Sequence, residues 1–289
     1  MDAFRDLLRE SHYWAREAGQ TVVRQADVER ALEARQYRSD RLRERVLEEI
    51  ERGAIVIDTE GERVGQVNGL SVFAFGGFLF GRPSRITART RLGRGELIDI
   101  EREVSLGEPI HSQGVLIFTG LLAGRYARDL PLSLSASLVF EQSYGSVDGD
   151  SASLAELCAP LESIADAPVG QSIAVTGSIG QHGQVQPVGA VNEKIEGFFD
   201  VCRRHGLQGA HGVILPRAHV EHPMLRQDVI QGVEQGRFHI YPVACVDEAA
   251  EILMGIPAGE PDEMGRFPSF TLNGDLEEHR LEEERLIRA

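Results

Sequence analysis

The chain has 289 residues, 42% of them hydrophobic, so it is long enough to bury a sizeable core. Its net charge of −15 argues against a nucleic-acid partner, and it has no run of about 18 apolar residues that could cross a membrane. The N-terminus lacks the apolar run of a signal peptide, and three scattered cysteines form neither a disulfide framework nor a CxxC metal site, so we expect a cytoplasmic protein.

The first part of the chain, residues 1–53, predicts three short helices. Apolar residues recur at helical spacing, Gly19 suits a helix stop, and the third charged stretch ends at Gly53. These helices have too little core for an independent domain. We therefore expect a lead-in segment from something larger.

Residues 54–145 predict strands, because their segments are rich in β-branched residues and are separated by glycine. We expect mostly antiparallel pairing without long crossovers. The segments are AIVIDTEG, VGQVNGLSVFAFG, RITARTRLG, ELIDIEREV and VLIFTGLLAG.

Helices and strands alternate from about residue 150 to residue 255, which predicts βαβ units with right-handed crossovers. Pro160 is expected to kink or divide the first of these helices. The fold class is therefore α+β or α/β, with mixed sheets spanning residues 54–255. Residues 256–289 form a Pro/Gly-rich linker and a charged tail with poor apolar periodicity, expected to be solvated or partner-dependent.

One lysine, Lys194, stands among 30 basic residues, and the other 29 are arginines. A GC-rich genome would favour arginine and explain most of this bias. Arginine cannot lose its proton in a protein, whereas a buried lysine can. The solitary lysine is therefore a candidate for a task that needs a neutral amine, although its survival by chance is an equal alternative.

The segment SYGSVDGDSAS, residues 143–153, leads through two glycines and two aspartates to Ser151 at a predicted helix start. A nucleophile at a helix N-terminus lies beside free amide groups that can bind an oxyanion. A plain helix cap is the alternative, and from this segment alone it is favoured, since Asp and Ser are preferred at any helix start.

The segment TGSIGQHGQVQPVGAVNEKIEGFF, residues 176–199, predicts a strand end, a Gly-rich turn and a helix that carries Lys194. Ile195 and Phe198 mark the apolar face of that helix, so Lys194 flanks a buried stripe. Partial burial would lower its pKa and make it a base near neutral pH. The alternative is a surface lysine paired with Glu193 or Glu196.

Together, the DGDSAS and VGAVNEK boxes and the Thr-Gly of SIAVTG resemble the proteolytic domain of the Lon protease family over about residues 54–255. That family has a DGPSAG-type serine box and a GG-x-x-EK lysine box. The long stretches around both boxes look most like the Lon-like branch that differs from the common bacterial enzyme. Residues 1–53 look similar to the end of the small helical AAA+ subdomain that precedes the protease.

The resemblance implies a serine endopeptidase in which Ser151 is the nucleophile, Lys194 the general base and Thr176 an orienting group for the lysine. It also implies a partial oxyanion hole, and a family aspartate that influences whether the site is open, at these supporting positions: Asp148, Gly149 and Asp150. It further implies a homo-oligomeric ring, usually a hexamer, that acts on unfolded or flexible polypeptides.

This sequence departs from the family pattern at three positions. Asp150 replaces the usual proline, Ser153 the usual glycine, and Ala190 the second glycine of the lysine box. None of these changes removes a catalytic group, but an acidic Asp150 would raise the pKa of Lys194 and oppose the effect of its burial. They motivate an alternative in which the chain is a non-catalytic assembly or substrate-binding module.

A Ser-His-Asp site is a further alternative, with a conventional esterase as its function. No GxSxG elbow occurs, and most of the candidate histidines are expected on exposed loops, although His182 in the Gly-rich hairpin is within conceivable reach. The candidates considered are His111, His182, His205, His211, His219, His222 and His239.

No metal or other cofactor is expected, because neither HExxH nor GxxxxGK[ST] occurs. ATP would be used only by an ATPase domain upstream of this chain.

Overall fold

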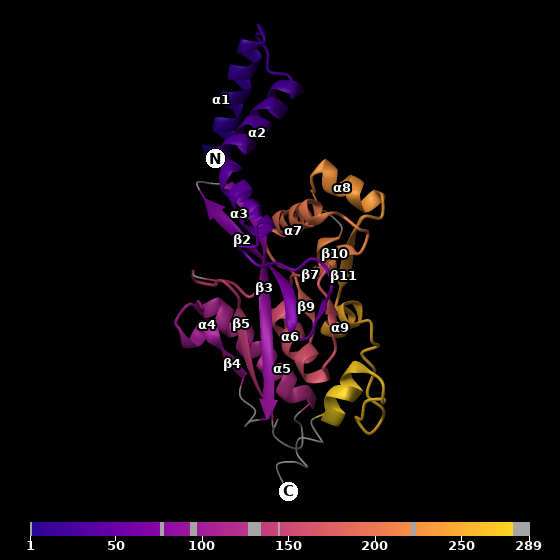
Figure 1. Cartoon of the computed structure of the whole chain (residues 1–289). Coiled ribbons are helices and arrows are strands. Elements are labelled where there is room, and N and C mark those ends of the chain that lie inside the picture. Colours follow the sequence, from indigo (N-terminus) through magenta and orange to yellow (C-terminus); the bar gives the residue numbers. More distant parts are fainter. Residues whose placement is uncertain are drawn as a thin grey trace.

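A computed structural model describes residues 2–75, 78–92, 97–126, 134–143, 145–220 and 224–279 (Figure 1). The helices within these ranges are α1 Asp2–Glu17, α2 Gln25–Ser39, α3 Arg41–Glu51, α4 Ile100–Glu103, α5 Pro109–Tyr126, α6 Ser153–Ala165, α7 Val191–His205, α8 Gln227–Glu234 and α9 Val246–Met254, with a short 3₁₀ turn at Arg217–His219. The strands are β1 Glu62–Arg63, β2 Gln66–Phe75, β3 Phe78–Leu92, β4 Leu97–Asp99, β5 Leu134–Phe140, β6 Val169–Gly170, β7 Ile173–Val175, β8 Ser178–Ile179, β9 Val185–Gln186, β10 His211–Pro216 and β11 Phe238–Val243.

A mixed seven-stranded sheet in the order β11-β10-β7-β2-β3-β5-β4 organises the molecule. β2, β3 and β5 pair antiparallel, as the glycine-punctuated segments predict, whereas β2–β7, β7–β10 and β10–β11 pair parallel. The helices α7 and α8 connect successive parallel strands. The predicted α/β class with mixed sheets is therefore confirmed.

Helices cover both faces of the sheet at β10, and that strand is buried along its whole length. On β10, Val213 packs into a cluster with Ile195 and Phe198 of α7, whereas the next residue, Ile214, packs into a cluster with α6 and α9. Two helices on opposite faces, α6 and α7, are thereby fixed at the middle of the sheet (Figure 1).

The segment VLIFTGLLAG forms part of α5 rather than the strand that its composition predicts. A short apolar run cannot be assigned to helix or strand by periodicity alone. Here Val115, Phe118 and Leu122 lie on one helical face and pack into the large cluster beneath the sheet. The preceding ELIDIEREV is likewise split between β4 and the single turn of α4. Pro160 lies inside α6, which continues through it as one helix.

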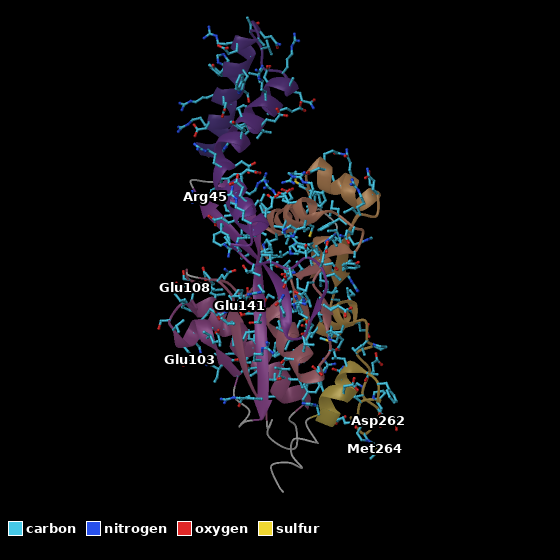
Figure 2. All side chains as sticks on the ribbon, viewed as in Figure 1. Arg45, Glu103, Glu108, Glu141, Asp262 and Met264 are labelled. Carbon is cyan, nitrogen blue, oxygen red and sulfur yellow. The ribbon has the colours of Figure 1, made fainter. Side chains whose placement is uncertain are left out.

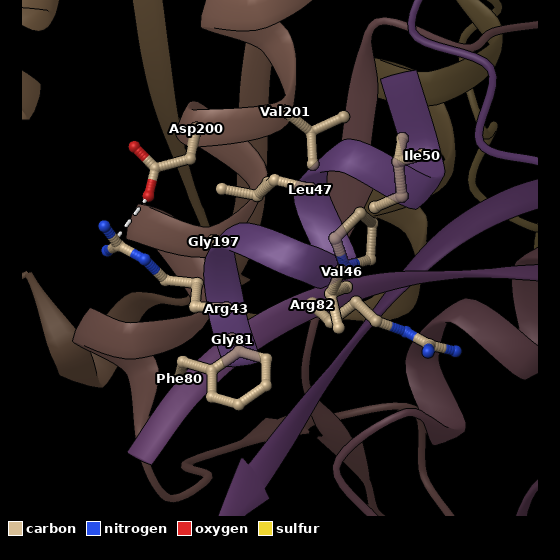
Figure 3. A pocket seen from close by; sticks show the side chains of 11 residues that line it. Arg43, Val46, Leu47, Ile50, Phe80, Gly81, Arg82, Gly197, Asp200 and Val201 are labelled. Atoms are coloured by element: carbon tan, nitrogen blue, oxygen red, sulfur yellow. Dashed lines mark ion pairs between the residues drawn. The ribbon is translucent and has the colours of Figure 1, made fainter. Parts of the chain in front are cut away.

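The N-terminal helices extend away from the sheet, and α3 joins them to the rest of the chain (Figure 1). Leu47 and Ile50 of α3 form a small apolar cluster with Val201 of α7. In the same contact Arg43 of α3 pairs with the buried carboxylate of Asp200 on α7 at 3.3 Å (Figure 3). Helix α3 therefore packs directly against α7.

The C-terminal region packs onto the core more closely than its composition predicts. Residues 272–279 are helical, and Leu272 and Leu276 are buried in the large cluster. Asn273 accepts a hydrogen bond from the Tyr126 hydroxyl of α5. The expectation of a solvated tail is therefore wrong for these residues, and residues 280–289 lie outside the described part of the chain.

Many of the side chains that project from the ribbon end in oxygen or nitrogen atoms (Figure 2). Glu103 of α4 and Glu108, just before α5, are among the exposed acidic residues behind the net charge of −15. Within the described ranges, no helix is both long enough and apolar enough to cross a lipid bilayer.

Candidate active site

Ser151 lies in the turn that joins β5 to α6. Gly149 in this turn has φ of +83°, a left-handed conformation that favours glycine. The capping position of α6 is taken by Ala152, without a side-chain capping bond. Ser151 is half-buried, and its hydroxyl accepts a hydrogen bond from Lys194. The alternative in which this serine is a plain helix cap is therefore wrong.

Lys194 lies in the first turn of α7, and its side chain points into the protein with only 2% exposure. Its amine donates to the Ser151 hydroxyl at 2.7 Å and to the Thr176 hydroxyl at 3.0 Å. The alternative of a surface lysine is wrong, and Glu196 instead accepts a hydrogen bond from the Arg226 amide. Burial lowers the pKa of Lys194 from 10.5 to about 8, while the charge of Asp150 acts in the opposite direction.

Thr176 directly follows β7 and connects the sheet to both Ser151 and Lys194. Its amide donates to Ile214 of β10 at 3.0 Å, and its hydroxyl donates to the Ser151 carbonyl at 3.1 Å while accepting from Lys194. The next amide, that of Gly177, also donates to the Ser151 carbonyl at 2.9 Å. The turn that carries the serine is thereby tied to the end of β7.

The position of α7 is set by a backbone contact with β3. A Cβ atom built on Gly81 would lie 2.0 Å from the Glu193 carbonyl oxygen and 2.7 Å from the Lys194 Cα. A Cβ atom built on Gly197 would lie 2.2 Å from the Gly81 carbonyl oxygen. Strand and helix approach so closely that only glycine fits on both sides, and this approach places Lys194 beneath the serine.

The two aspartates of the serine box have different surroundings. Asp148 is exposed, and its carboxylate accepts from the adjacent Gly149 amide at 2.7 Å. Asp150 is half-buried, and its carboxylate accepts from the Ser178 hydroxyl at 2.6 Å. Ser178 lies in the Gly-rich hairpin and was not among the residues that the sequence predicts for the site.

The other two departures from the family pattern are also accommodated. Ser153 faces inward in the first turn of α6, and its hydroxyl accepts from the Ile179 amide at 3.2 Å. Ala190 has φ of +54° at the start of α7, a conformation that glycine would adopt with less strain. Neither residue separates Ser151 from Lys194.

Within the part of the chain that the structure describes, none of the candidate histidines hydrogen-bonds to the Ser151 hydroxyl, which accepts from Lys194. The expectation that most of them are exposed on loops is wrong, because only His182 is exposed among the six described candidates. His111 in α5 and His211 in β10 are buried, and the other three are half-buried: His205, His219 and His239. His182 is exposed and lines a separate hollow with Gly120 and Arg125, and His222 lies outside the described residues. Among the described residues, no cluster of His, Cys, Asp and Glu could hold a metal ion.

Comparison with known proteins identifies related domains in two parts of the chain. Residues 143–255 match the Lon protease (S16) C-terminal proteolytic domain, and residues 1–38 match the AAA+ ATPase LID domain of archaeal LonB. The first match contains both the serine turn and α7.

Individual relatives are similar over most of this chain. A putative Lon protease homolog of Escherichia coli strain K12 is 48% identical over 227 residues, which are 78% of this chain and 39% of the relative. A putative Lon protease homolog of Haemophilus influenzae is 48% identical over 218 residues, 74% of this chain and 36% of the relative. An archaeal Lon protease of Archaeoglobus fulgidus is 28% identical over 247 residues, 85% of this chain and 37% of the relative. The chain thus spans less than two-fifths of the length of these relatives.

Proposed function

Because this chain carries the proteolytic domain of the Lon protease family, we propose that it is a serine endopeptidase in which Ser151 is the nucleophile and Lys194 the general base. The observation that carries the proposal is the 2.7 Å hydrogen bond between the lysine amine and the serine hydroxyl. The buried amine is the base within hydrogen-bond reach of that hydroxyl, which is the geometry that a nucleophile and its base require.

The reaction begins when neutral Lys194 takes the proton of the Ser151 hydroxyl as its oxygen attacks the peptide carbonyl. Backbone amides of residues 149–151, just before α6, would stabilise the negative charge on the carbonyl oxygen. The Lys194 ammonium then gives its proton to the departing amine, which leaves an acyl-enzyme. A water molecule, activated by the same amine, hydrolyses the ester and restores the free serine.

Thr176 supports this reaction by orienting the base. Its hydroxyl holds the Lys194 amine on one side and the Ser151 carbonyl on the other. The Gly149 amide donates a hydrogen bond to the Asp148 carboxylate. This amide can therefore bind an oxyanion only when the carboxylate turns away.

We expect the rate constant kcat/KM to rise with pH through about 8, because the Lys194 amine must lose its proton before it can act as a base. Asp150 favours the charged amine, so Asp150→Asn should move this rise to lower pH. Asp148→Asn is the matched control, since Asp148 is exposed and bonded to Gly149. A rise that stays in place in Asp150→Asn would contradict the assignment of this limb to Lys194.

The substrates that we propose are unfolded or flexible polypeptides, cleaved within a homo-oligomeric ring, hexameric in its usual form, in the cytoplasm. Support comes from the family match and from the LID-type helices at the N-terminus. ATP enters this proposal only through an ATPase domain outside the present chain.

A non-catalytic module is the second candidate function, motivated by the departures at Asp150, Ser153 and Ala190. An active-site probe distinguishes the two candidates. A fluorophosphonate should label wild-type protein on Ser151 and should leave Ser151→Ala unlabelled, with mass spectrometry of the modified peptide as the measurement. Absence of labelling at every pH between 6 and 10 would favour the module. Rapid ester turnover that survives loss of Lys194 would instead favour a conventional esterase.

A further inference from the structure

A second group of ionisable side chains lies buried next to the serine turn. His111 of α5 is fully buried, and its Nε2 atom lies 2.7 Å from the Glu156 carboxylate of α6. Its Nδ1 atom lies 3.7 Å from the Asp99 carboxylate at the end of β4. Glu101 of α4 is also buried and accepts a hydrogen bond from the Phe140 amide of β5. One histidine thus lies against two buried carboxyl groups, Glu156 and Asp99, while the third, Glu101, acts on it through its charge.

Two contacts connect this group to the serine turn, one through α6 and one through α5. The Glu156 amide donates to the Ala152 carbonyl and so closes the first turn of α6 immediately after Ser151. One turn along α5 from His111, a Cβ atom built on Gly114 would lie 3.3 Å from the Asp150 Cβ. The contact between α5 and the serine turn at Gly114 therefore lies one helical turn from the buried pair of His111 and Glu156.

The segment leading into α5 holds the other side of the same turn. The Val147 amide donates to the Leu106 carbonyl at 2.9 Å, and the Val147 carbonyl accepts from the Glu108 amide at 2.9 Å. A Cβ atom built on Gly107, which lies between Leu106 and Glu108, would be 3.0 Å from the His111 Nδ1 atom, so this segment passes close to the ring. A shift of His111 would therefore be transmitted to the serine turn through Gly107 and through Gly114.

We propose that the ionised pair of His111 and Glu156 is a positioning element for Ser151, which fixes the serine turn at the distance that the lysine requires. This inference rests on the proposed peptidase function. His111 and Glu156 touch neither the nucleophile nor the base, so they act through α5 and α6.

The charges around the pair favour an imidazolium. Burial opposes the charged ring, but the hydrogen bond and charge of Glu156, with the charges of Asp99 and Glu101, raise the pKa of His111 overall. Burial also raises the pKa of Glu156, against the effect of His111. The charged groups outside the pair that act on it are Asp99 of β4, Glu101 of α4 and Asp150 of the serine turn. A buried charge without its partner is costly, so loss of either member should displace the helices.

The experiment compares His111→Gln, Glu156→Gln and the double variant, with His12→Gln on the exposed face of α1 as control. The readouts are the rate of fluorophosphonate labelling of Ser151 per folded molecule, and kcat and KM for an unfolded protein substrate. Each single variant should label about 10–100-fold more slowly, since a small misplacement of reacting groups costs that much, and kcat should fall while KM stays. The double variant should recover at least about tenfold over the singles, because two neutral amides can hydrogen-bond to each other.

Single variants that label at the wild-type rate, or a double variant whose loss is the product of the single losses, would overturn the pairing. If His111→Gln fails to fold, nitrogen NMR of wild-type histidines at pH 7 supplies the test. A solvent-protected ring with both nitrogens protonated supports the proposal, and the lack of one overturns it. Wild-type protein that the probe never labels would refute the peptidase function itself, whereas labelled wild type with unaffected variants would refute only this inference.

Discussion

Lys194→Arg is expected to lower kcat for cleavage of an unfolded protein such as casein by about 10²–10⁴-fold, the scale on which a general base contributes. The change keeps the positive charge and removes the base, because the guanidinium does not lose its proton in a protein. The buried Lys194 amine, by contrast, is neutral in a large fraction of molecules near pH 8. The measurement is the initial rate of casein fragment release at saturating substrate.

Two controls separate loss of the base from loss of the fold. Ser151→Ala should be inactive to a similar degree, and combining it with Lys194→Arg should cause little further loss, since residues that act as one unit are not additive. Lys194→Met should be as inactive as Lys194→Arg while fitting the buried site without a charge, and its thermal unfolding reports on the fold. Cleavage by Lys194→Arg at near the wild-type rate would show that the dyad is wrong.

The sequence was most informative where a functional residue lies within a local pattern. Ser151 follows a glycine-punctuated turn and Lys194 lies beside the apolar stripe of α7, but the serine segment alone favours a plain helix cap, and the resemblance of both boxes to the Lon family is what singles out the pair. The burial of the lysine follows from the same stripe, because Ile195 and Phe198 draw that face of α7 onto the sheet.

The sequence was least informative where a contact joins distant segments. His111 and Glu156 are 45 positions apart, and α5 itself was predicted as a strand, so no local pattern could bring them together. Leu272 and Leu276 are spaced one helical turn apart, but the charged residues around them favoured the prediction of a solvated tail, and their burial was not predicted. In these cases the burial of a residue and its secondary structure depend on its tertiary contacts, which a single sequence does not reveal.

Gly81 is an intermediate case, because the glycine is visible in the sequence but the close backbone contact that requires it is not. It lies within β3, where glycine weakens a strand unless a backbone approaches closely. Gly197 lies inside α7, where glycine costs about 1 kcal/mol relative to alanine. The structure explains both residues by one contact, in which the Gly81 carbonyl meets the α7 backbone at Gly197.

Gly81→Ala is therefore expected to destabilise the protein by about 1–3 kcal/mol, the usual cost of overpacking, and to lower kcat by about 10²-fold. The added Cβ would meet backbone atoms of Glu193 and Lys194 at 2.0–2.7 Å, so α7 must shift and carry the lysine amine with it. Denaturant unfolding measures the first effect and casein cleavage the second.

Gly197→Ala tests the same contact from the helix side and should produce the same two losses despite its better helix propensity. The matched control is Gly120→Ala on the exposed side of α5, where a Cβ atom would make only an ordinary 3.7 Å contact with the Gln181 side chain. That variant should gain about 0.5–1 kcal/mol and cleave at the wild-type rate. If Gly81→Ala behaves like the control, the position of Lys194 does not depend on the approach of β3. If it loses activity as expected, a contact from a strand residue far from both boxes in the sequence is what brings the base to the nucleophile.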